Sequence, residues 1–131
     1  MQEKTQDLTG VWNGLYSYPD GRSVTFVATL IESASAVTGS THEPCVGAHC
    51  PAATLFANLV GSRSGSAVTF RKTYESAGPH YRSVDYAGTL NGEATEIEGR
   101  WTIPGVWSGK FLMIRPEREA TKADEQVAQR A

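Results

Sequence analysis

Hydrophobic and polar residues alternate along most of the chain between Thr9 and Pro116. A period of two indicates β-strands, because successive side chains of a strand point to opposite faces of a sheet. Turn-forming residues, such as the Pro-Asp-Gly at 19–21 and the Asn-Gly at 91–92, separate eight such segments. The segments cover residues 10–18, 23–32, 36–43, 54–61, 66–74, 81–90, 95–103 and 107–115. Since no amphipathic helix interrupts them, the pattern predicts an all-β fold.

Short turns connect the eight segments in order, which is typical of an antiparallel meander. Closing a meander into a barrel removes the exposed edge strands. We therefore predict an eight-stranded antiparallel up-and-down β-barrel over residues 9–116, preceded by an N-terminal extension at 1–8. The polar tail at 117–131 is rich in Ala, Glu and Gln. Its apolar stripe is thin, so we expect either a short, loosely docked helix or disorder.

Two features at opposite ends of the chain carry a resemblance to a known family. Gly10, Val11 and Trp12 lie on the first segment, and Arg115 lies near the end of the last. This pattern resembles the signature of the calycins, which include lipocalins, fatty-acid-binding proteins and avidins, and the order of the strands looks more similar to avidin. The resemblance implies that Arg115 crosses Trp12 and closes one end of the barrel. A guanidinium over an indole contributes roughly 0.5–2 kcal/mol, so the pair also makes physical sense as a structural closure.

This closed end gives the barrel a direction. If the first strand starts at the closed end, odd-numbered strands finish at the open end, which we call the mouth. The loops after the third, fifth and seventh strands, around residues 44–53, 75–80 and 104–105, then lie together at the mouth. All three histidines and both cysteines fall there.

Alternation predicts that Lys72, Arg82 and Glu43 point into the barrel near the mouth. Two inward cations among aromatic side chains suit a small apolar or aromatic molecule that bears an anionic group and is held in an open-ended cavity. The candidate ligand-binding residues are Tyr18, Glu43, Lys72, Tyr74, Arg82, Tyr86, Trp101 and Trp107. The alternative is that Glu43 neutralises the cations and fills the barrel. The protein would then be a non-enzymatic interaction module whose loops or tail contact another protein.

The stretch HEPCVGAHC at 42–50 invites a third, weaker interpretation as a metal or thiol site. Its spacing matches no common zinc arrangement. The candidate ligands are His42, Cys45, His49, Cys50 and His80, and a cysteine nucleophile with a histidine base would make the barrel an enzyme. A disulfide or two thiols in a loop at the mouth is the simpler interpretation. We expect no cofactor, and enzymatic activity stays open with a preference against it.

Charge and hydropathy narrow the choice of partners. Twelve basic and fourteen acidic residues are interspersed and give a net charge of -2, which does not favour nucleic acid or an anionic membrane. The 131 residues suffice for a single domain. The first residues lack the apolar segment of a secretory signal, and no apolar run is long enough to span a membrane. We therefore expect a soluble, cytoplasmic protein.

Overall fold

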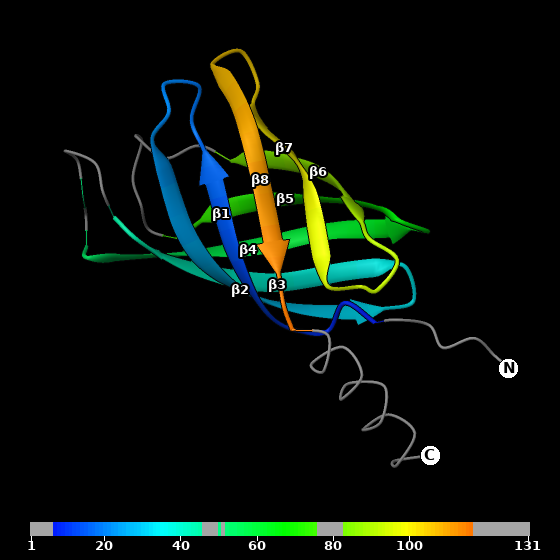
Figure 1. The fold of residues 1–131 in the computed structure, drawn as a ribbon. Helices are drawn as coiled ribbons and strands as arrows, with labels where there is room; N and C mark the ends of the chain where they lie inside the picture. The colour runs from blue at the N-terminus through cyan, green and yellow to red at the C-terminus, as the bar shows by residue number, and fades with distance from the viewer. Residues whose placement is uncertain (1–6, 46–49, 51, 76–82, 117–131) are drawn as a thin grey trace, which may run out of the picture.

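The computed structural model describes residues 7–45, 50, 52–75 and 83–116. Eight antiparallel strands pair in sequence order, and the last pairs with the first to close a barrel (Figure 1). The strands are β1 (Gly10–Ser17), β2 (Ser23–Ser33), β3 (Ala36–Pro44), β4 (Thr54–Ser64), β5 (Ala67–Tyr74), β6 (Val84–Leu90), β7 (Glu96–Ile103) and β8 (Trp107–Ile114). The predicted all-β, eight-stranded up-and-down barrel is confirmed. The tail at 117–131 lies outside the described residues.

Burial alternates along each strand as the sequence pattern predicts. On β2, for example, Val24, Phe26, Ala28 and Leu30 are all buried, while the residues between them face outward or are half-buried. The inward side chains of all eight strands form one hydrophobic core inside the barrel. The alternation therefore decides which side chains can contribute to an interior site.

Two predicted boundaries at the strand ends are corrected. β4 runs to Ser64 instead of ending at residue 61, because Ser62–Ser64 still pair with β5 and the chain turns only at Gly65, whose φ is 61°. β8 ends at Ile114, so Arg115 follows the last strand instead of belonging to it.

Leu8, which precedes β1, packs against the barrel. It is fully buried, and its carbonyl accepts a hydrogen bond from the Trp12 indole at 2.9 Å.

The barrel wall is not paired along its whole height. Pairing between β2 and β3 stops at Val27 and His42. Beyond that point, Glu43 and Pro44 pair only with β4, and residues 23–26 pair only with β1. β2 and β3 therefore diverge at the mouth end, beside the interior position of Glu43. Among the described residues, no helix is long and apolar enough to cross a membrane.

Candidate functional site at the mouth of the barrel

A buried ion pair lies inside the barrel toward the mouth. The Lys72 ammonium on β5 donates to the Glu43 carboxylate on β3 over 2.5 Å, and the two residues are 1% and 3% exposed. Both side chains come from the inward face of their strands, as the alternation predicted. Removing two charges from water costs several kcal/mol for each ion, and this cost is offset only by close pairing and further hydrogen bonds. The pair therefore depends on the groups that surround it.

Two tyrosines complete the hydrogen bonding of the Glu43 carboxylate. The Tyr16 hydroxyl on β1 donates to one carboxylate oxygen over 2.5 Å, and the Tyr74 hydroxyl on β5 lies 3.2 Å from both oxygens. Burial raises the pKa of Tyr16 and of Tyr74 well above the ordinary value, and the nearby Glu43 charge adds to the effect. Both hydroxyls therefore stay protonated and act as donors to the carboxylate.

Lys72 is enclosed by aromatic rings as well as by Glu43. Its ammonium lies 4.8 Å from the Tyr74 ring centroid, 5.0 Å from that of Tyr16 and 5.1 Å from that of Phe26. Burial lowers the pKa of Lys72, while the Glu43 charge and hydrogen bond oppose this shift. Since Glu43 compensates the ammonium, the pair has no net charge.

An aromatic cluster lies above the ion pair at the mouth. Tyr18 follows β1, Trp107 begins β8, and their ring centroids are 4.9 Å apart. The Trp101 ring lies 5.5 Å from that of Tyr18, and its indole donates to the Ser17 carbonyl over 2.9 Å. Trp101 is fully buried, whereas Tyr18, Tyr74 and Trp107 are only partly buried against the core. The cluster thus has a fixed base and a partly exposed rim.

A glycine makes room for the Trp101 ring, the buried part of this cluster. A side chain at Gly109 on β8 would place its Cβ in overlap with the Ser17 carbonyl oxygen and 2.7 Å from the Trp101 indole nitrogen. No real Cβ approaches so closely, so only glycine allows the Trp101 indole to lie against β8 and reach β1. The sequence therefore fixes the position of this ring through a neighbour on another strand.

One buried polar atom near the pair has no hydrogen-bond partner in the part of the chain that the structure describes. The Thr41 hydroxyl lies on the same inward face of β3 as Glu43, two residues earlier, and is buried without a hydrogen bond among the described residues. An unsatisfied buried hydroxyl costs about 1–3 kcal/mol. A water or a ligand group that reached this hydroxyl would remove that cost.

The closed end is built differently. The Arg115 guanidinium lies 4.4 Å from the Trp12 ring centroid, and both side chains are almost completely buried. Its nitrogens donate to the backbone carbonyls of Asp7 at 2.6 Å, Ala94 at 2.9 Å and Thr9 at 3.1 Å. Arg115 therefore ties the segment at Asp7–Thr9 and the turn at Ala94 to the end of β8.

The cysteines form a disulfide between Cys45 and Cys50. Both sulfurs are therefore bonded, and neither can act as a thiolate nucleophile or metal ligand in this state. The described part of the chain contains no group of three His, Cys, Asp or Glu residues placed to hold a metal. His42 faces outward beside Phe56, with 6.3 Å between the ring centroids, and His49 and His80 lie outside the described residues.

The structure thus brings together most of the predicted binding residues. Glu43, Lys72 and Tyr74 meet at the ion pair, Tyr86 stacks on Phe70 beneath it with 4.9 Å between centroids, and the aromatic cluster lies above. Arg82 lies outside the described residues. Sequence reasoning missed Tyr16 and Thr41, although both share an inward face with residues that it had already placed inside.

The comparisons with known proteins support the fold. A solved structure of a de novo designed, fluorescence-activating beta barrel is similar, with a TM-score of 0.62 over 88% of this chain and 100% of that chain. The two sequences are 12% identical, so the likeness concerns the fold alone. No protein-family model matches the chain. The search of curated proteins finds no match either.

Proposed function

We propose that the protein binds a small apolar or aromatic molecule at the mouth of the barrel. One observation carries the proposal: the partly exposed rings of Tyr18, Tyr74 and Trp107 lie at the same end of the barrel as the buried pair of Lys72 and Glu43, which forms a polar floor. Ligand sites usually combine a largely apolar wall with a few fixed polar groups. The resemblance to calycins, many of which bind small molecules, supports the same function.

The polar floor restricts the chemistry of the ligand. Because Glu43 compensates the charge of Lys72, the floor is neutral and offers both donors and an acceptor. A hydroxyl or amide group on an aromatic ligand suits it. The anionic group that the sequence suggested requires a further cation at the mouth, and Arg82 is the candidate for it.

Fluorescence titration with two dyes tests the proposal. We expect the neutral dye Nile red to bind saturably with one site per chain, and the anionic dye anilinonaphthalene sulfonate to bind through Arg82. Tyr18→Ala and Trp107→Ala should each weaken Nile red binding about tenfold, since each removes one aromatic wall. Ile114→Ala, on the outer surface of β8, is the matched control and should leave binding unchanged. Binding that does not saturate, or that ignores both mouth variants, would overturn the proposal.

A second candidate is favoured by the buried pair itself. Lys72, Glu43 and Tyr16 form a hydrogen-bonded plug, which is what a filled barrel acting as an interaction module requires. Its partner would be another protein, bound through the loops or the tail. In that case neither dye binds at the mouth, and a partner captured by the full chain is lost when residues 117–131 are removed.

A further inference from the structure

The outer surface of the barrel divides sharply by charge. None of the outward-facing residues of β1, β2, β3 and β4 is Asp, Glu, Lys or Arg. The outward positions of the other four strands carry six charged residues, namely Arg71, Asp85, Glu96, Glu98, Arg100 and Lys110. We call the outer surface of β1–β4 the neutral face. A solvated barrel wall has no need of such a division.

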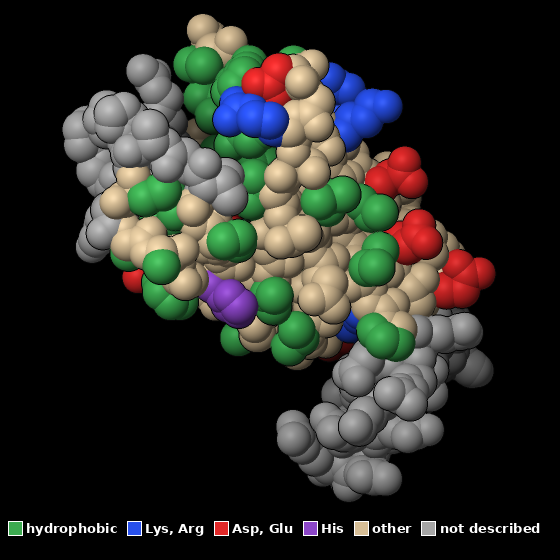
Figure 2. All heavy atoms as spheres, turned by 60° about the vertical axis from the view of Figure 1, so that its left-hand side comes forward, with side chains coloured by type: hydrophobic (Ala, Val, Ile, Leu, Met, Phe, Trp, Pro, Cys, Tyr) green, Lys and Arg blue, Asp and Glu red, His purple; other side chains and the backbone are tan. Residues whose placement is uncertain are grey.

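The neutral face also exposes large apolar side chains. Val60 is 65% exposed, Ile31 56%, Val11 55% and Phe56 54%. Much of this side is turned toward the viewer in Figure 2, where hydrophobic and uncharged side chains fill the middle and charged ones lie toward the edges. Exposed apolar side chains that gather on one uncharged face indicate an interaction site.

The size of the face fits a stable interface. Four strands about 4.8 Å apart and roughly nine residues long cover on the order of 600 Å² in flat projection, and more as accessible surface. A standard-size interface buries about 800 Å² on each partner. The area of the face is therefore of the same order as one side of a standard interface.

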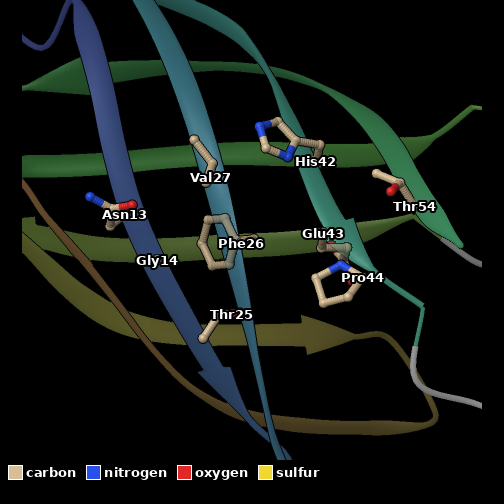
Figure 3. Close-up of a pocket in the computed structure, with 9 residues that line it drawn as sticks. All are labelled: Asn13, Gly14, Thr25, Phe26, Val27, His42, Glu43, Pro44 and Thr54. Atoms are coloured by element: carbon tan, nitrogen blue, oxygen red, sulfur yellow. The ribbon is translucent and has the colours of Figure 1, made fainter.

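A groove lies next to the exposed phenylalanine on this face. It has a volume of about 420 Å³ and lies where β2 and β3 diverge. Its lining is mostly uncharged and includes Thr25, Val27, His42 and Pro44, with Phe26 between β1 and β3 (Figure 3). Among the described residues of the lining, the one that is charged is Glu43, whose charge Lys72 compensates. Phe56 is paired with His42 in the sheet, so this ring stands at the edge of the groove.

We propose that the neutral face is a homodimer interface, in which Phe56 of each chain packs into the groove of the other. A face without charges requires a partner face without charges, because charged groups buried against it would lack partners. The same face on a second copy meets this requirement. In a two-fold contact each chain supplies the same knob and the same groove, and an aromatic ring in a pocket is the usual centre of such an interface.

Sedimentation velocity over a concentration series tests the proposal. The wild-type chain should sediment as a dimer at about 10 µM. Phe56→Lys and Val60→Lys each bury two unpaired charges in the dimer and should raise its dissociation constant by at least about 100-fold. Both residues are exposed in the single chain, so the variants should keep its circular dichroism spectrum.

Two further variants separate the groove from the face and provide the control. Thr25→Trp fills the groove without adding charge and should weaken the dimer about tenfold. Ala87→Lys, on the outer face of β6, adds the same charge on the charged side and should leave the dimer intact. A wild-type monomer at about 100 µM, or a dimer indifferent to Phe56→Lys and Val60→Lys, would overturn the proposal.

Discussion

The barrel buries a cation at each end, but it satisfies the two in different ways. At the closed end the Arg115 guanidinium donates to three backbone carbonyls and covers the Trp12 indole. At the mouth the Lys72 ammonium is paired with the Glu43 side chain, which two tyrosine side chains also contact. Backbone carbonyls move only with the chain, whereas side chains can change rotamer. The closed end is therefore a fixed joint, whereas Lys72 at the mouth is held by side chains, which suits the ligand site that we propose there.

The largest effect is expected at the closed end. Arg115→Met removes three charge-assisted hydrogen bonds to backbone carbonyls, one of them buried and two part-buried. Each such bond is worth about 1.5–3 kcal/mol, so the free energy of unfolding should fall by at least about 4 kcal/mol. Urea unfolding followed by circular dichroism measures this loss. Lys110→Met, at an exposed position of β8, is the control and should change stability by less than about 0.5 kcal/mol. A small loss in Arg115→Met would contradict the fixed joint.

At the mouth, a second substitution should rescue the first. Lys72→Met leaves the buried Glu43 charge uncompensated and should cost about 3–5 kcal/mol. The double variant Lys72→Met with Glu43→Gln removes both charges and should recover all but about 1 kcal/mol. The same unfolding experiment measures both. If the double variant is as unstable as Lys72→Met alone, the charges of Lys72 and Glu43 do not compensate each other.

The tyrosines at the mouth should resist ionisation at high pH. Burial raises the pKa of Tyr16, Tyr74 and Tyr86 above the ordinary value near 10. Above pH 10 the unfolded chain loses these protons while the folded chain keeps them. Stability should therefore fall by about 1.4 kcal/mol per tyrosine at pH 11.

Lys72 should change the free energy of unfolding with pH in the opposite direction to the tyrosines. Burial lowers its pKa, so the unfolded chain holds the proton more tightly and stability rises with pH up to about 10.4.

Absorbance at 295 nm should detect at most two of the five tyrosines ionising before the barrel unfolds at alkaline pH. Ionisation of all five in the folded state would contradict the buried cluster.

The smallest effect is expected for the disulfide. Cys45 and Cys50 are five residues apart and close a short loop, so replacing both with serine should cost about 2 kcal/mol, at the low end for disulfides. Because neither sulfur takes part in the ion pair or the aromatic cluster, dye affinity should change less than twofold. Thermal unfolding and the Nile red titration check the two parts separately.

Alternation in the sequence was sufficient to predict the barrel and the inward direction of Lys72 and Glu43. It could not predict that Tyr16 contacts Glu43, although Tyr16 lies on the same face of β1 as Trp12. Strands of a closed barrel are tilted and staggered, so alternation tells which side a residue faces but not its height along the barrel axis. For the same reason, the sequence did not show that β2 and β3 diverge beside Glu43.

At the closed end, too, the sequence predicted only part of the contacts that Arg115 makes. The resemblance to calycins implied that Arg115 meets Trp12, and the guanidinium does lie over that ring. Its hydrogen-bond acceptors are backbone carbonyls of Asp7, Thr9 and Ala94. Backbone groups carry no signal in the sequence, because every residue has a carbonyl. These contacts become visible only in three dimensions.

The chain's three tryptophans provide the most direct test of the difference between the two ends. Trp12 lies at the closed end, whereas Trp101 and Trp107 lie at the mouth. Their indole N–H resonances can be followed separately by ¹H–¹⁵N NMR while Nile red is added. We predict that the Trp107 and Trp101 resonances shift saturably and that the Trp12 resonance stays in place. Resonances that all remain unchanged, or a shift confined to Trp12, would contradict a ligand site at the mouth.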